Sequence, residues 1–273
     1  MLRASPIMRR SSTMLRATRQ QPLRQVVRCL ASNASTGGAL QTAQEKREEQ
    51  ELQHHLLLDE KTRTHMRKTY ACTLSSCGVA SVAAVGGLMV GIHTVPMVGI
   101  GMALGSMVPM VMFTKAERTD TTKRQMLLTA FTSMQGLSVA PLLYASTQFG
   151  ASIPAALGGT VLIFGGATLG SLMLPRASLL PYGSALGGGC MLLIGGGLAS
   201  IFFPEMMPVG TQALLTYGGL GLFTAFVAYD THQVMERFRM GDDDHVQHSM
   251  SFFIDAMGIF KHLLVAQMMG DRE

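Results

Sequence analysis

Charged side chains are almost absent from the long middle part of the chain, and this scarcity constrains the fold more than any other feature. Only 14% of all residues are charged, against about a quarter in soluble domains. A soluble helical bundle needs a polar face on each helix, and this part of the chain has none. The pattern predicts an all-α membrane protein. Between Tyr70 and Tyr229 the formal charges are Lys115, Glu117, Arg118, Asp120, Lys123, Arg124, Arg176 and Glu205.

Seven apolar segments follow one another along this part of the chain and predict seven transmembrane helices. Each of the first six has about the 20 residues that a helix needs to cross a bilayer. The seventh is shorter and carries polar side chains, so it is not expected to face lipid all round. Glycines four residues apart, such as Gly101 with Gly105 and Gly166 with Gly170, predict closely packed helices. The predicted spans are 70–92, 95–113, 126–147, 153–174, 182–203, 211–230 and 252–269.

The N-terminal residues have the composition of a mitochondrial transit peptide. Residues 1–44 contain seven arginines, many serines and threonines, and no acidic residue. The stretch "RCLASN" resembles a matrix-protease site, with cleavage after Leu30. Removing residues 1–30, which hold all seven arginines, changes the net charge from +5 to −2. The basic excess therefore gives no support to nucleic-acid binding. A disordered basic tail without a targeting role is the alternative. Residues 31–69 are predicted to be a polar, partly helical segment on the matrix side, and residues 70–273 the membrane domain.

Basic residues gather on one side of the seven predicted spans. The other side has only Arg272, joined by Lys261 if its side chain reaches outward. Together with the leader, this bias predicts a multi-pass protein of the mitochondrial inner membrane. It places the N-terminal side in the matrix and the C-terminus in the intermembrane space. The residues on the basic side are Lys61, Arg63, Arg67, Lys68, Lys115, Arg118, Lys123, Arg124, Arg176, Arg237 and Arg239.

Two aspartates are the candidate functional residues, because they stand in or beside apolar sequence. Asp230 closes the sixth span and Asp255 lies inside the seventh. An acid near the bilayer midplane costs about 3 kcal/mol, so such residues usually face the bundle interior and have a function there. Two neighbouring carboxylates do not both ionise easily and share a proton, here near physiological pH. Protonated, the pair holds two helices together. Deprotonated, it repels itself and attracts a divalent cation, for which calcium is suited by its preference for oxygen ligands.

Other interpretations of these polar residues remain open at this point. Asp230 could end its helix at the interface, and Asp255 could make a structural contact with Lys261 or His262. His262 falls on the Asp255 face of a helix, which makes it a possible accessory residue of a proton path, whereas Lys261 is rotated away. The loop "GDDDHVQH" offers a second divalent-ion hypothesis, although it lacks the ligand spacing of an EF-hand. Its potential ligands are Asp242, Asp244, His245 and His248.

Four segments carry a set of motifs that occurs together in one known family. They are "KRQMLLTAFTSMQGLSVAPLLY" (123–144), "AYDTHQV" (228–234), "GDDDHV" (241–246) and "FFIDAMGIFKHLL" (252–264). This set resembles the transmembrane Bax-inhibitor-motif family over about residues 65–270. The leader resembles the mitochondrial branch of that family, the growth-hormone-inducible transmembrane proteins.

The resemblance implies a seven-helix bundle in which the last, acid-bearing helix is central and is wrapped by two three-helix sheaths. It also implies a pH-sensitive calcium leak or calcium/proton exchange governed by Asp230 and Asp255, which are the aspartate pair by motif position. The mitochondrial branch is further associated with cristae organisation and restraint of apoptosis. In bacterial members an arginine of the second span engages the aspartates. Residues 95–113 contain no charge, so this latch is expected to differ or to be missing.

These observations lead to one principal function and one alternative. The principal prediction is a pH-sensitive calcium leak channel or calcium/proton exchanger, with calcium and protons as transported ions, calcium bound at Asp230 and Asp255, and no cofactor. The alternative is a non-conducting scaffold that holds inner-membrane or cristae proteins. An enzyme is not expected. Intramembrane aspartyl proteolysis requires a Gly-x-Gly-Asp context, and the two acids stand in "AYDT" and "FIDA".

Overall fold

The computed structural model describes residues 60–175, 178–206, 208 and 210–270. The chain divides into two units, Met1–Glu60 and Lys61–Glu273, and the described residues belong almost entirely to the second. The predicted leader, the first part of the polar segment and Arg176 lie outside the described residues. The predicted boundary at residue 69 falls inside a continuous helix, Glu60–Val90, that is long and apolar enough to span a membrane.

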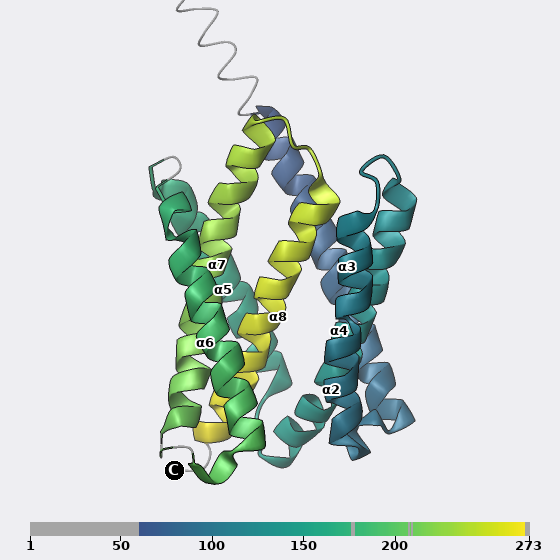
Figure 1. The fold of residues 1–273 in the computed structure, drawn as a ribbon, viewed down its shortest axis with the longest axis vertical. Coiled ribbons are helices and arrows are strands. Elements are labelled where there is room, and N and C mark those ends of the chain that lie inside the picture. The colour runs from purple at the N-terminus through teal and green to yellow at the C-terminus, as the bar shows by residue number, and fades with distance from the viewer. Residues whose placement is uncertain (1–59, 176–177, 207, 209, 271–273) are drawn as a thin grey trace, which may run out of the picture. The chain divides into compact units, whose positions relative to one another are not determined.

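Every element in the described part of the chain is helical, and seven helices there are long and apolar enough to cross a membrane (Figure 1). The prediction of an all-α, seven-span protein is therefore confirmed. The second span, Met97–Lys115, is made of two helices that meet at Ser106. The helices after Glu60–Val90 are η1 (Ile92–Thr94), α2 (Pro96–Gly105), α3 (Met107–Lys115), α4 (Thr121–Gln148), α5 (Ile153–Met173), η2 (Leu180–Tyr182), α6 (Gly183–Phe202), η3 (Pro204–Met206), α7 (Thr211–Arg239) and α8 (His245–Gly270).

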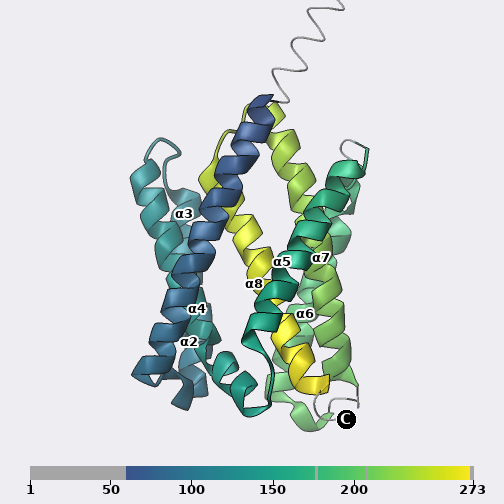
Figure 2. The same ribbon diagram turned by 180° about the vertical axis from the view of Figure 1, so that it is seen from behind.

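Helix α8 is the central element of the bundle, as the resemblance implied. It contacts α4, α5 and α7, and Phe252, Ile259 and Leu264 along its length are fully buried. In Figure 1 it runs between α5–α7 on one side and α2–α4 on the other. In the view from behind, the Glu60–Val90 helix and α5 lie in front, on the face of the bundle that is turned away from the viewer in Figure 1 (Figure 2). Two groups of helices thus enclose the helix that carries Asp255.

The last two membrane helices are longer than the hydropathy pattern predicted. Helix α7 continues nine residues beyond Asp230 to Arg239, and α8 begins at His245, seven residues before the predicted start of the seventh span. The predicted loop 231–251 is reduced to a short connection. Polar side chains in these extra turns are buried by specific partners: the His232 Nε2–H donates to the Ser171 carbonyl oxygen of α5 at 2.7 Å. Hydropathy missed these turns because it scores such residues as solvated.

Close helix packing depends on single glycines rather than on the predicted glycine pairs. A Cβ atom added at Gly101, Gly166 or Gly170 would meet nothing within 4 Å. At Gly136 of α4, by contrast, a Cβ would lie 2.2 Å from the carbonyl oxygen of Ala80. The backbones of α4 and the Glu60–Val90 helix therefore touch at this point, and no side chain fits between them.

We expect Gly136→Ala to destabilise the bundle by about 2–3 kcal/mol, because the added methyl group collides with rigid backbone rather than with a movable side chain. The matched control is Gly166→Ala, where open space leaves only the gain in helix propensity, about 0.5–1 kcal/mol. Thermal unfolding of the two purified variants in detergent checks this. Equal stability of both variants would contradict the close approach of the two backbones.

Candidate functional site

Asp230 and Asp255 lie at the same depth of the bundle on neighbouring antiparallel helices. Asp230 is nine residues before the end of α7, and Asp255 is ten residues after the start of α8. At 1.5 Å per residue these positions are about 14 and 15 Å from the ends that the 240–244 connection joins. Among the helices from η1 to α8, these two have the most extensive contact. The hairpin therefore brings both acids to one level inside the membrane region.

Both carboxylates are buried and act on each other electrostatically. Asp230 is 9% exposed and Asp255 4% exposed, and the Asp230 charge is felt at Asp255. The hypothesis that Asp230 ends its helix at the interface is wrong, because the helix continues and covers it. The Ser251 hydroxyl of α8 lies near the Asp230 carboxylate. The Asp255 Oδ2 atom has no hydrogen-bond partner within the described part of the chain. Two unneutralised charges are costly here, so the geometry favours a pair that keeps a proton.

Aromatic rings cover the aspartate pair toward the basic end of the bundle. Tyr70 of the Glu60–Val90 helix stacks on Phe252, with ring centroids 5.1 Å apart, and meets Phe164 of α5 edge-on at 6.3 Å. Phe252 lies one turn before Asp255 and is completely buried. The cluster therefore packs about one turn from Asp255, on the side of the N-terminal end of α8.

A second aromatic contact closes the other side of the pair. Phe223 of α7 packs so tightly on Gly258 of α8 that a Cβ there would lie 2.5 Å from its ring. Beyond Phe223 is the imidazole of His262, which rests on Gly219 and tilts against Phe223 with centroids 5.6 Å apart. Asp255 and His262 thus both face α7, as helical spacing predicted. They are separated by the Phe223 ring, so His262 does not touch the aspartate pair directly.

Lys261 points away from the aspartates toward α4. Its ammonium donates to the Gln135 Oε1 atom at 3.1 Å, and the Gln135 amide donates in turn to the Ser106 hydroxyl at 2.9 Å. A structural ion pair between Asp255 and Lys261 is therefore wrong, and so is a Lys261 side chain that reaches outward. Lys261, His262 and Gln135 line a cavity of about 270 Å³ that sequence reasoning did not anticipate.

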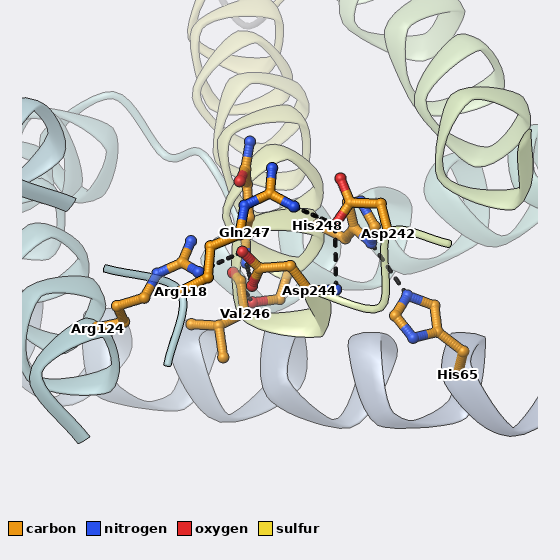
Figure 3. Close-up of polar contacts among 9 residues, drawn as sticks. His65, Arg118, Arg124, Asp242, Asp244, Val246, Gln247 and His248 are labelled. Carbon is orange, nitrogen blue, oxygen red and sulfur yellow. Dashed lines mark hydrogen bonds and ion pairs between the residues drawn. The ribbon is translucent and has the colours of Figure 1, made fainter. Parts of the chain in front are cut away.

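Two arginines clamp the acidic connection between α7 and α8 at the basic end of the bundle (Figure 3). Arg118 donates to Asp242 at 3.1 Å, and Arg124 of α4 pairs with Asp244. The first pair is exposed, with 66% of the Arg118 side chain accessible. The second is buried, with 4% of Arg124 and 9% of Asp244 accessible. Asp244 also accepts from the Gln247 backbone N–H and so caps α8. We call these two ion pairs the arginine latch.

A histidine pair ties the same end of α8 to the Glu60–Val90 helix. The His65 Nε2 and His248 Nδ1 atoms are 3.0 Å apart, and one ring donates to the other (Figure 3). The His65 ring also stacks on Phe238 of α7, with centroids 4.4 Å apart. An imidazole can accept a hydrogen bond only when it is neutral, so this contact breaks once both rings are protonated.

These contacts change the interpretation of the loop "GDDDHVQH". Asp242 and Asp244 are engaged by arginines and His248 by His65. Among the described residues there is no group of three or more His, Cys, Asp or Glu side chains that could hold a metal ion. The loop's role is therefore to anchor α8. Arg118 and Arg124 thus engage the acids of the connection, and they do not pair with Asp230 or Asp255.

Comparison with known proteins identifies relatives over most of the chain. The family described as "Inhibitor of apoptosis-promoting Bax1" matches residues 62–273. Bax inhibitor 1 of Homo sapiens is 31% identical over 215 residues, 78% of this chain and 88% of that protein. Bax inhibitor 1 of Bos taurus is 31% identical over 218 residues, with 78% and 89% covered. The Arabidopsis thaliana protein of the same name is 28% identical over 176 residues, with 61% and 67% covered.

We expect Arg124→Gln to destabilise the protein by about 3 kcal/mol, because it leaves the buried Asp244 carboxylate without its partner. The matched variant Arg118→Gln should cost about 0.5 kcal/mol or less, since its ion pair is exposed and screened by solvent. Thermal unfolding in nanodiscs compares the two. A loss for Arg124→Gln no greater than that for Arg118→Gln would show that the buried pair does not hold α8.

Proposed function

Because the chain belongs to the Bax inhibitor family, whose members are membrane proteins related to apoptosis, we propose that it conducts calcium in a pH-dependent way. It acts as a calcium leak channel or a calcium/proton exchanger, and Asp230 and Asp255 form its gate. The observation that supports this most is the burial of two interacting carboxylates at one level between α7 and α8. Among the described residues neither acid forms an ion pair with a basic side chain, and Arg237 acts on Asp230 only from a distance. A carboxylate pair in such a place is suited to exchanging a proton.

The gate follows from the charge of the pair. With a shared proton, the two carboxyl groups attract each other and keep α7 and α8 in contact. Without it, they repel each other and form a site of negative charge that attracts calcium. A rise in pH therefore opens the path, and a fall in pH closes it. Two carboxylates provide only part of the six to eight oxygen ligands of calcium, so the Ser251 hydroxyl, backbone carbonyls or water complete the shell.

The packing around the pair supports a closed path in this conformation. Phe223 packs on Gly258, about one turn after Asp255, and the Tyr70, Phe164 and Phe252 rings pack together about one turn before it. Past Phe223 there are two cavities, of about 270 and 300 Å³, that both include His262 in their walls. In this proposal opening moves the Phe223 ring away from Gly258, and a proton that leaves Asp255 reaches the cavity lined by Lys261 and His262.

The proposed location is the mitochondrial inner membrane. It is supported by the arginine-rich, acid-free residues 1–44 and by the resemblance of this leader to the mitochondrial branch. The basic ends of the described helices lie at the end of the bundle that carries the arginine latch, which is the matrix side in this proposal. Roles in cristae organisation and in restraint of apoptosis belong to the same proposal.

We expect wild-type protein in liposomes to carry more calcium at pH 8 than at pH 6, by about tenfold or more if one proton controls the gate. Asp255→Asn removes the acid with which Asp230 shares a proton, so its flux should depend on pH much less steeply than that of the wild type. Calcium flux into the liposomes, recorded from pH 5.5 to 8.5 with an encapsulated fluorescent calcium indicator, measures this. Equal pH profiles for the wild type and Asp255→Asn would remove the pair from the mechanism.

The matched control for this experiment is His248→Gln, because the His65–His248 pair is another contact of α8 that is made by titratable side chains. Its profile should keep the pH dependence that Asp255→Asn loses.

A pH electrode distinguishes the two modes of transport, since exchange moves protons against calcium and a leak does not. Liposomes that remain tight to calcium at every pH would favour the scaffold function, and the enzyme question is answered separately by peptide hydrolysis.

The location has its own test. A full-length fusion with a fluorescent protein at the C-terminus should collect in mitochondria, and the same fusion without residues 1–30 should not. Replacing the seven arginines by glutamine should have the same effect as the deletion, because the charge of the leader drives its import. Unchanged mitochondrial fluorescence for both variants would contradict the proposal that residues 1–30 direct the protein to mitochondria.

A further inference from the structure

Lys261 is a cation inside the membrane region for which the proposed calcium path has no use. It is 16 residues from the start of α8 and nine from its end, about 24 and 14 Å along the axis. The Lys261 residue is partly buried in the bundle. Lysines at this depth are rare and usually have a partner or a ligand. A fixed positive charge would also repel calcium, so a role as a calcium ligand does not fit.

The hydrogen bonding of Lys261 is incomplete. An ammonium group has three donors, and one of them is used by the Gln135 Oε1 atom. That oxygen belongs to a neutral amide and does not compensate the charge. Asp255 lies on a different face of α8 from Lys261, and Asp230 belongs to α7. No acidic side chain is among the described residues that line the cavity. Two donors and a full positive charge are thus left for whatever occupies the cavity.

The cavity itself is amphipathic. Its polar groups, Lys261, His262 and Gln135, lie among apolar and aromatic side chains. Its volume of about 270 Å³ exceeds the share of liquid volume of a single water molecule, about 30 Å³, by roughly ninefold. A site of this kind accommodates an anionic group together with some hydrocarbon. The apolar lining consists of Phe131, Phe223, Phe253, Ile254, Met257 and Gly258.

We propose that this cavity is a binding site for a carboxylate, held by the Lys261 ammonium. One fixed cation matches one negative charge, and the flat carboxylate offers a second oxygen to the Gln135 amide or the His262 ring. A phosphate, with its higher charge, would need more cations than the lining provides. The carboxylate can come from a fatty acid of the membrane or from a small free acid, and the chemistry at Lys261 is the same for both.

A second cavity gives this site access from the side of α6. It measures about 300 Å³ and shares Phe223 and His262 with the first. Its other walls come from α6, α7 and the end of α8, with Gln212 and Ser200 among the polar groups. Neighbouring side chains of α6, such as Leu192 and Leu198, are exposed on the lipid side. A hydrocarbon chain therefore has a route from the bilayer past His262 to Lys261, which favours a fatty acid as the source.

The test uses purified full-length protein in nanodiscs and three ligands: laurate, acetate, and dodecanol, which has the chain of laurate without the carboxylate. We expect saturable laurate binding by isothermal titration calorimetry and little binding of dodecanol. Tighter binding of laurate than of acetate identifies a membrane fatty acid as the source, and equal binding identifies a small free acid. Equal binding of laurate and dodecanol would overturn the proposal, because the carboxylate would then contribute nothing.

Variants connect the binding to the ammonium. Lys261→Gln should lose about tenfold or more in laurate affinity, since a charged hydrogen bond is removed, and Lys261→Arg should retain most of it. Lys123→Gln, which removes an exposed lysine from the start of α4, is the matched control and should bind as the wild type does. Wild-type affinity in Lys261→Gln would overturn the proposal. Photolabelling of the wild type with a diazirine-bearing fatty acid needs no variant and should modify residues of the cavity walls. Labels found only outside the cavity walls would also overturn the proposal.

Discussion

The structure depends on one constraint: a charge within a membrane bundle must find a partner or lose its ionisation. Helix α8 carries most of the groups to which this applies. Asp244, at its start, is neutralised by Arg124, Lys261 is turned toward an amide of α4, and Asp255 meets a second acid of α7. Each of these groups would be costly at the lipid surface. The central position of α8, surrounded by two groups of helices, follows from this need to keep its polar side chains away from lipid.

Asp244 and Asp255 are stabilised in different ways. Asp244 has a structural role, whereas Asp255 belongs to the proposed functional site. Asp244 has a cation beside it and caps the helix, so it is fully used by the fold. Asp255 has only Asp230 as a charged neighbour and keeps one oxygen without a hydrogen bond. A fold that needed only stability would gain by replacing this pair with apolar residues of similar size. This pair is therefore the part of the structure on which the proposed exchange of a proton is based.

Much of the architecture could be predicted from the sequence, because hydropathy and helical spacing are local properties. The seven spans and the common α7-facing side of Asp255 and His262 are of this kind. The extra turns of α7 and α8 were not predictable, since the burial of His232 depends on a carbonyl of α5 that is 61 residues away. The partners of Arg124 and Lys261 are likewise distant in sequence. Counting basic residues by side located Arg124 at the right end of the bundle but did not identify Asp244 as its partner.

The arrangement along α8 also connects its parts mechanically. The arginine latch and the histidine pair hold the helix at its first turn, the aspartate pair holds it near the middle, and Lys261 is bound to α4 beyond Phe223. A rigid helix transmits rotation along its whole length, so a separation of α7 from α8 at the aspartates acts on all three attachments. The Phe223–Gly258 contact lies between the second and third of them, where no side chain of Gly258 hinders the ring. In the proposed gate, repulsion between the two carboxylates would act next to this contact and would move the Phe223 ring.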